Sequence, residues 1–166
     1  MQRAPGESRM YRVAYGDGEI EFMLQPWFAL EVGTAASGAT PHDIVVTGVG
    51  RPDDADLGRA LRAASVLAPA VREGGAMVIA AQLDDVVDED DAPPAAPELT
   101  HGGRLAIVAA SEAPELARLA GLRAAVDVEE ALDIAYEHIG RPERASVLLV
   151  PRALHTLPVV QEPVRT

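Results

Sequence analysis

The sequence predicts a three-layer α/β sandwich with a largely parallel sheet, preceded by an N-terminal β-hairpin. Two observations predict this class. Between His42 and Gln82 a buried strand, a polar turn, an amphipathic helix and a second buried strand follow one another, which is one βαβ unit. Further apolar strands and capped helices then alternate as far as Val150. At 166 residues and 48% hydrophobic composition, the chain is long enough to bury one core.

The N-terminal hairpin is predicted from alternating apolar and polar residues at 10–15 and 19–24, around the turn Gly16-Asp17-Gly18. Residues 1–9 are expected to form a loose tail, and residues 33–41 are a linker of small residues. We therefore divide the chain into an N-terminal part, 1–40, and an α/β domain, 41–166.

The βαβ unit begins with a strand at 43–48 and continues with a helix near 54–71. Gly74-Gly75 is expected to end the helix. The next strand, 76–81, is uniformly apolar, as a parallel strand covered on both faces should be. One face of the helix carries the apolar stripe Leu57, Leu61, Ala64, Leu67, Ala68 and Val71.

An acidic, proline-containing segment at 84–100 is predicted to be a loop. A strand at 104–110 follows. Ser111 is expected to cap a short helix that ends at Gly121.

The last helix is predicted at 128–139, because Asp127 and Glu130 have the spacing of a capping box. It is expected to stop at Gly140, and the last strong strand spans 146–150. Periodicity does not predict the order of the strands in the sheet.

The turn after the first buried strand contains Gly48-Val49-Gly50, but the dinucleotide-binding fingerprint needs a third glycine where this chain has Asp53. Asp53, Asp54 and Asp56 crowd the start of the helix. Their carboxylates satisfy the free N–H groups there and repel a phosphate. The fold is therefore expected to be Rossmann-like without binding NAD, FAD or ATP.

An ordered series of motifs resembles the C-terminal domain of nickel-pincer lactate racemases, the LarA family, over roughly residues 41–160. The series comprises Gly50-x-Pro52-x-Asp54, a helix containing Ala60, Gly74-Gly75, Pro114-Glu115-Leu116, Gly121-Leu122, Val128-Glu129-Glu130-Ala131-Leu132 and Thr156-Leu157-Pro158-Val159.

In that family a larger N-terminal domain holds the pincer nucleotide, the nickel and the catalytic histidines, and a lysine tethers the pincer. Residues 11–22 look like the opening strands of that domain, but after Val32 the sequence passes almost directly to the C-terminal domain. All fourteen basic residues are arginines, so no lysine can hold a cofactor covalently. The resemblance implies no cofactor in the isolated chain, and a nickel-pincer nucleotide only where a separate chain supplies it.

The resemblance also implies substrate-binding positions. The family's helix presents a glutamine and a lysine to the substrate carboxylate, and here those positions are Arg59 and Arg62. Two guanidinium groups on one helix face could hold a carboxylate bidentately. The family's preceding tyrosine is Gly58 in this chain, which puts the ancestral substrate in question. The candidate substrate-binding residues are Gly50, Asp54, Arg59 and Arg62.

The alternative for Arg59 and Arg62 is a pair of solvated side chains near Asp56 and Glu73. No catalytic residue is assigned, because the sequence shows no convergent acid, base and nucleophile. No metal site is predicted either. The acidic residues at 84–91 lack the spaced ligands and glycine of an EF-hand, and the histidines lack metal-binding spacing; they are His42, His101, His138 and His155.

Charge and composition exclude some partners. The net charge of −12 disfavours nucleic acid and anionic membranes, since both rely on basic patches. The chain has no cysteine, no apolar run of membrane-spanning length and no signal-peptide core at its N-terminus, so we expect a cytoplasmic protein. The sequence leaves open whether the chain forms a homo-oligomer.

Three functions stay open at this point. The first is a non-catalytic relative of the racemase C-terminal domain that binds a small 2-hydroxy or 2-oxo acid or a protein partner. The second is one subunit of a split 2-hydroxy-acid racemase, an isomerase, with the pincer domain on another chain. The third is an enzyme with a reassigned active site. We favour the first.

Overall fold

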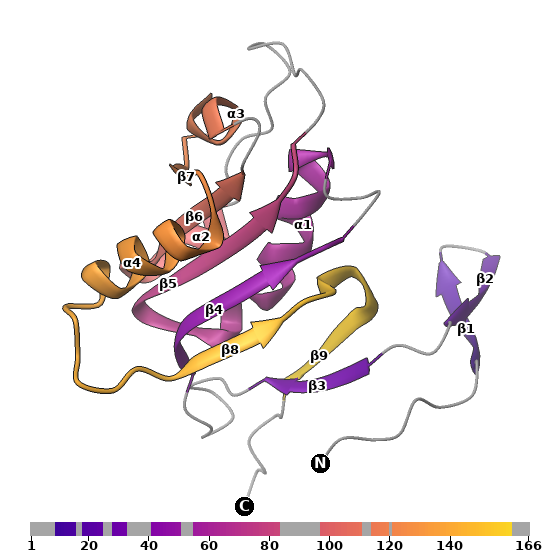
Figure 1. Cartoon of the computed structure of the whole chain (residues 1–166). Coiled ribbons are helices and arrows are strands. Elements are labelled where there is room, and N and C mark those ends of the chain that lie inside the picture. The colour runs from indigo at the N-terminus through magenta and orange to yellow at the C-terminus, as the bar shows by residue number, and fades with distance from the viewer. Residues whose placement is uncertain are drawn as a thin grey trace, which may run out of the picture.

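The structure, a computed structural model, describes residues 9–15, 18–24, 28–32, 41–50, 55–83, 97–110, 114–119 and 121–160. Its main sheet is made of β4 (His42–Gly48), β5 (Val71–Ala81), β6 (Leu105–Ala110), β7 (Arg123–Ala125) and β8 (Val147–Val150). The helices are α1 (Leu57–Leu67), α2 (Pro97–Thr100), α3 (Pro114–Leu119) and α4 (Val128–His138). All five strands are parallel, in the order β7-β6-β5-β4-β8 (Figure 1). The predicted Rossmann-like α/β class is confirmed.

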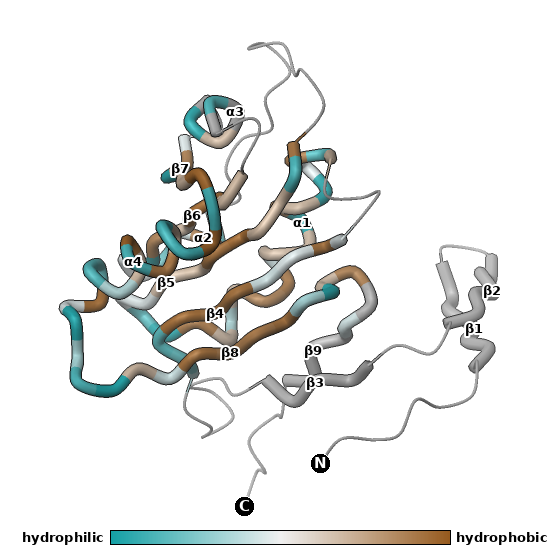
Figure 2. Tube along the Cα trace, in the orientation of Figure 1, coloured by the Kyte–Doolittle hydropathy of each residue, from teal (hydrophilic) through white to brown (hydrophobic). Residues whose placement is uncertain are grey.

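Helices cover both faces of this sheet. In Figure 1, α4 lies on the near side and α1 on the far side. One buried cluster joins α1 to the far face through Val45, Met77 and Val108, and the other joins α4 to the near face through Val46, Val78 and Ile107. Figure 2 shows the hydrophobic colour along β4 and β8. The core therefore has two layers, one on each side of the sheet.

The strand order follows from the direction of the connections. From β4 the chain steps outward through β5 and β6 to β7, and α4 then carries it back to β8 on the other side of β4. Right-handed crossovers in opposite directions place their helices on opposite faces. The chain therefore changes direction between β4 and β8.

The N-terminal hairpin is present as β1 (Arg9–Tyr15) and β2 (Gly18–Leu24), which pair antiparallel. Two residues of its predicted turn, Gly16 and Asp17, lie outside the described residues. A further pairing was not anticipated: β3 (Phe28–Val32) runs parallel to β9 (Thr156–Val160). Segments from the two ends of the chain thus share a sheet.

The end of the first helix was predicted wrongly. All six residues of the apolar stripe are buried as expected. However, α1 ends at Leu67, a single 3₁₀ turn at Ala68–Ala70 follows, and β5 begins at Val71. Pro69 explains the early stop, because proline lacks the N–H that would continue the helix by donating to the Ser65 carbonyl, and the Ala68 N–H donates to that carbonyl instead.

Gly74-Gly75 therefore lies inside β5 instead of ending a helix. The register between β4 and β5 shifts between His42 and Ile44, opposite this pair. A Cβ on Gly75 would lie 2.7 Å from the Asp43 carbonyl oxygen. The glycine is needed because two backbones approach closely at the irregularity.

In the second half, the predicted strand at 104–110 is β6, and the predicted short helix is α3. Its proposed cap, Ser111, lies outside the described residues, as do residues 84–96. The loop prediction is wrong for residues 97–100, which form α2, because Leu99 is buried against the core. The three-residue strand β7 was not predicted.

At the amino ends of the strands, Asp43 connects three elements. Its carboxylate accepts hydrogen bonds from the Ser146 N–H at 2.7 Å, the Ser146 hydroxyl at 2.9 Å and the Arg72 Nε at 2.5 Å. The Ser146 N–H and the Arg72 side chain lower the pKa of Asp43 from 3.8 to about 2, against the opposing effect of burial. The start of β4 is therefore tied to β5 and to the approach to β8.

The helices of the described part are short, and none of them has the length and apolar character needed to cross a membrane.

Candidate functional site

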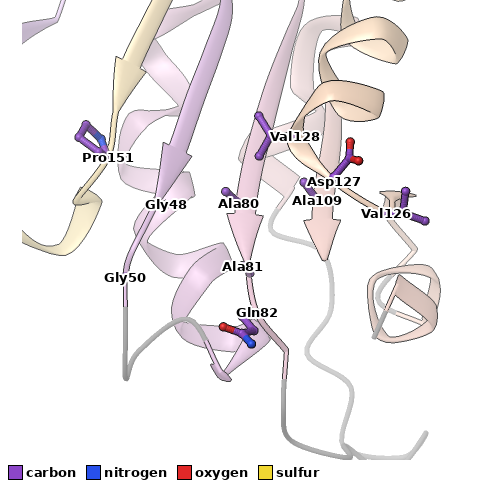
Figure 3. Close-up of a pocket in the computed structure, with 10 residues that line it drawn as sticks. All are labelled: Gly48, Gly50, Ala80, Ala81, Gln82, Ala109, Val126, Asp127, Val128 and Pro151. Atoms are coloured by element: carbon purple, nitrogen blue, oxygen red, sulfur yellow. The ribbon is translucent and has the colours of Figure 1, made fainter. Parts of the chain in front are cut away.

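A pocket of about 390 Å³ opens at the carboxyl ends of the parallel strands. Figure 3 shows Gly48 and Gly50 at the end of β4, Ala80 to Gln82 at the end of β5, and Asp127 at the start of α4. Ala109 of β6 and Pro151, which follows β8, complete the lining with Val126 and Val128. We call this the carboxyl-edge pocket.

Its position follows from the topology. The loop after β4 leads to α1 on one face of the sheet and the loop after β7 leads to α4 on the other, so the two loops diverge and leave a crevice at the carboxyl ends. Open α/β sheets bind ligands at such a switch point. Gly50 and Asp127 belong to these two loops, and both line the pocket. The fold therefore places a crevice where a ligand is expected.

Small side chains keep the pocket open. Gly48, Ala80 and Ala109 come from three adjacent strands. A Cβ on Gly48 would lie 3.3 Å from the Ala80 carbonyl oxygen, which is a tight contact. Gly50 has φ +78°, a conformation that other residues rarely adopt. The turn at Gly50 therefore favours a glycine, and at Gly48 an added Cβ would need the Ala80 carbonyl to shift by a few tenths of an ångström.

The polar end of the pocket is the start of α4. Asp127 caps this helix by accepting from the Glu130 N–H at 2.8 Å, and the Glu130 carboxylate accepts from the Val126 N–H at 2.7 Å. The predicted capping box is confirmed, with one difference: the Glu130 carboxylate accepts from the N–H of Val126, the residue before the cap, instead of from the N–H of Asp127 itself. These N–H groups already have carboxylate partners, so this end of the pocket is poorly suited to a phosphate.

The charge of the lining is negative. Among the described lining residues, Asp127 is the one ionisable side chain, and Gln82 is the one uncharged polar side chain. Acidic residues also occupy the first turn of α4, at Glu129 and Glu130. The remaining lining consists of glycine, alanine, valine and proline. A ligand would meet apolar side chains and peptide groups over most of its surface.

The structure places the predicted substrate-binding residues differently. Gly50 lines the pocket. Asp54 lies outside the described residues. Arg59 and Arg62 are exposed on α1 and do not line the pocket. Their role in binding a substrate stays a prediction.

Arg59 has an acidic neighbour, as the alternative interpretation expected. Its Nε lies 3.6 Å from the Asp56 carboxylate, and both side chains are at least half exposed. Asp56 is the cap of α1, where it accepts from the Arg59 N–H at 3.1 Å. An acidic residue therefore occupies the start of this helix, as expected for Asp56.

The four histidines come from four different elements. His42 lies in β4, His138 ends α4, and His101 and His155 lie in separate 3₁₀ turns. His138 Nε2 is 3.2 Å from the Gly103 carbonyl oxygen. In the described ranges, no three histidine or acidic side chains are placed to hold a metal ion.

The hydroxyl groups of β4 and α1 form structural hydrogen bonds. The Thr47 hydroxyl is buried and donates to the Val150 carbonyl at 3.2 Å, which ties β4 to β8. Ser65 donates to the Arg62 carbonyl within α1. Neither hydroxyl is therefore arranged as a nucleophile.

Sequence reasoning missed most of the pocket. It found Gly50 and the turn after β4, but not Ala80, Val126 or Pro151. A usable signal was present. The capping box at Asp127 marks a helix start directly after a strand, and helices of a parallel sheet begin at its carboxyl edge. Pro151 lines the pocket because β8 lies next to β4, and this strand order cannot be predicted from local sequence patterns.

The comparisons with known proteins agree with this architecture. The structure is similar to that of a lactate racemase apoprotein from Thermoanaerobacterium thermosaccharolyticum, with a TM-score of 0.57 and 18% sequence identity. The similarity covers 84% of this chain and 38% of that one. No protein-family model and no curated protein matches the sequence. The chain therefore has a lactate-racemase-like fold and spans well under half the length of that racemase.

Proposed function

We propose that this chain is a binding module with a lactate-racemase-like fold that takes a small 2-hydroxy or 2-oxo acid at the carboxyl edge of its sheet. It has no catalytic activity of its own. The observation that carries the proposal is the carboxyl-edge pocket, which lies where the loops that lead to α1 and α4 diverge toward opposite faces of the sheet.

The size of the pocket supports a small ligand. About 390 Å³ is near the lower end of the range for small-molecule sites. Its lining is mostly apolar, and peptide groups of Gly48, Ala80 and Ala81 border it. Such a lining can bind the short carbon chain of a hydroxy acid while peptide groups form hydrogen bonds to its oxygens.

The lining favours binding over catalysis. Proton transfer or covalent chemistry needs a base or nucleophile that reaches the ligand. In the described lining, the one titratable side chain is Asp127, and it already caps α4. A second group to work with it is not among those lining residues.

The carboxylate of the ligand has to avoid Asp127, because like charges repel. We place it toward α1, which begins at the same edge of the sheet and carries Arg59 and Arg62. To bind the ligand, Arg59 would exchange its contact with the Asp56 carboxylate for one with the carboxylate of the ligand. That exchange costs little, since an exposed ion pair contributes at most about 1 kcal/mol.

The second candidate is one subunit of a split racemase. The observation that favours it is the coverage, because this chain corresponds to 38% of the racemase apoprotein. The residues present do not fit the pincer nucleotide: the chain has no lysine for the implied tether, and its described part has no metal-binding group. A partner chain would have to hold that cofactor.

The main proposal is tested by filling the pocket. Ala80→Leu adds three carbons to the lining, and we expect it to abolish the amide chemical-shift changes that D-lactate, L-lactate or pyruvate produce around Gly48 and Gly50. The matched control is Ala145→Leu, which makes the same change near the amino end of β8. Titration of the wild type and both variants checks this.

The arginines are tested in the same titrations. Arg59→Gln with Arg62→Gln should weaken binding about tenfold, because a charge-assisted hydrogen bond contributes roughly 1.5–3 kcal/mol. The proposal is wrong if none of the three acids shifts the amides of the pocket. It is also wrong if Ala80→Leu binds them as the wild type does.

A further inference from the structure

A second pocket, of about 320 Å³, lies at the β7 edge of the sheet. Arg118 of α3, Arg123 of β7 and Glu130 of α4 line it, with Leu122 and Ala124. None of these residues lines the carboxyl-edge pocket. We call it the β7-edge pocket, and nothing in the proposed function uses it.

A fixed turn brings the two arginines to one place. The Gly121 N–H donates to the Arg118 carbonyl at 2.9 Å, and the Leu122 N–H donates to the Ala117 carbonyl at 3.0 Å. Gly121 has φ +72°, as such a helix-ending turn requires. Leu122 is buried and anchors the turn in the core. Arg118 and Arg123 therefore lie on either side of Gly121 and Leu122.

Glu130 is also held in position. One of its carboxylate oxygens accepts from the Val126 N–H at 2.7 Å. This bond fixes the side chain near the first turn of α4, on the border of the pocket. The carboxylate thus presents a second oxygen at a defined place beside the two arginines.

The charges of this pocket are unbalanced. Some arginines of the described part lie against a carboxylate, namely Arg59, Arg72 and Arg141, and others, such as Arg62 and Arg144, are exposed without an ion pair but do not share a pocket. Within the same part, the guanidinium groups of Arg118 and Arg123 have no ion pair or hydrogen bond. In a chain of net charge −12, two such groups at one pocket leave an unfilled site for an anion.

We propose that the β7-edge pocket binds an α-amino acid as a zwitterion. Its carboxylate lies between Arg118 and Arg123, and its ammonium group faces Glu130. Two positive groups and one negative group match one carboxylate and one ammonium. A phosphate would match the arginines but would be repelled by Glu130, and a hydroxy acid would offer Glu130 a neutral donor only.

Three probes of nearly equal size test this assignment: L-alanine, L-lactate and propionate. They differ only in the ammonium, hydroxyl or hydrogen at the second carbon. We expect amide shifts around Gly121 to Ala124, with L-alanine binding roughly two- to fivefold more tightly than L-lactate. Propionate should bind most weakly.

Variants assign the binding to named side chains. Arg118→Gln and Arg123→Gln should each weaken L-alanine binding about tenfold, whereas Arg144→Gln, an exposed arginine outside the pocket, should leave it unchanged. Glu130→Gln can still accept from the Val126 N–H, so the helix cap is kept. It should remove the preference for L-alanine over L-lactate.

The proposal is overturned if L-alanine does not shift the β7-edge amides, if the two arginine variants bind it like the wild type, or if L-lactate binds as tightly. Ala80→Leu separates this site from the first one. It fills the carboxyl-edge pocket and should leave L-alanine binding unchanged.

Discussion

Asp43 illustrates how one side chain fixes the order of strands. It joins Arg72 at the start of β5 to Ser146, which precedes β8 and is 103 positions away along the sequence. The hydrogen bonds require its ionised form, which is why its pKa falls to about 2. Stability should therefore depend on pH at this residue.

We expect Asp43→Asn to destabilise the protein at pH 7 by roughly 2 kcal/mol, the free energy that corresponds to the pKa shift. The folded pKa is depressed, so the contribution of Asp43 is present above pH 3.8 and is lost as the pH falls toward 2. The difference between wild type and variant in urea unfolding should shrink over that window. A difference that stays constant from pH 7 to pH 2 would contradict the assignment, and Asp133→Asn, exposed on α4, is the control.

At the scale of elements, the pairing of β4 and β5 depends on Gly75. A Cβ there would meet the Asp43 carbonyl oxygen at 2.7 Å and Val71 Cγ1 at 2.8 Å. One contact is backbone and the other is a buried side chain, so neither can move easily. The glycine pair that looked like a helix stop is instead part of the sheet.

Gly75→Ala should cost about 1–3 kcal/mol, because the added methyl group forces the two strands apart. Amide hydrogen exchange should speed up most in β4 and β5. The comparison is Gly103→Ala, where no atom lies within 4 Å of the added Cβ and only the positive φ opposes the substitution. If Gly75→Ala destabilises the protein less than Gly103→Ala does and leaves hydrogen exchange in β4 unchanged, the close approach of the two strands does not require the glycine.

At the scale of the whole molecule, the functions that can be proposed depend on how much of the racemase this chain matches. It spans 38% of the length of that apoprotein, and the pocket at its carboxyl edge has one titratable side chain among the described residues. A binding module and a subunit that completes a partner's site both fit this architecture.

We expect the isolated chain, supplied with the pincer nucleotide, not to interconvert D- and L-lactate above a cofactor-only control. The reason is the missing tether, since the chain contains no lysine. Chiral separation of the two lactates over time checks this. Turnover above the control would favour the enzymatic interpretation over the binding module, and turnover only after a cofactor-domain chain is added would favour the split racemase.

The sequence by itself determined the features that depend on near neighbours. Apolar runs predicted β4 and β6, the stripe on α1 predicted its buried face, and the spacing of Asp127 and Glu130 predicted the start of α4. These signals are local, because periodicity and capping bonds involve residues within a few positions of one another.

Tertiary structure alone decided the strand order and both pockets. The Ile44 N–H bonds to the Ser146 carbonyl, and this distant pairing sets β8 beside β4 and brings Pro151 to the carboxyl-edge pocket. It also decided that Gly74-Gly75 lies in a strand and that Arg118 and Arg123 share a pocket with Glu130. Such contacts join segments that are far apart in the chain, and local periodicity carries no information about which of them will meet.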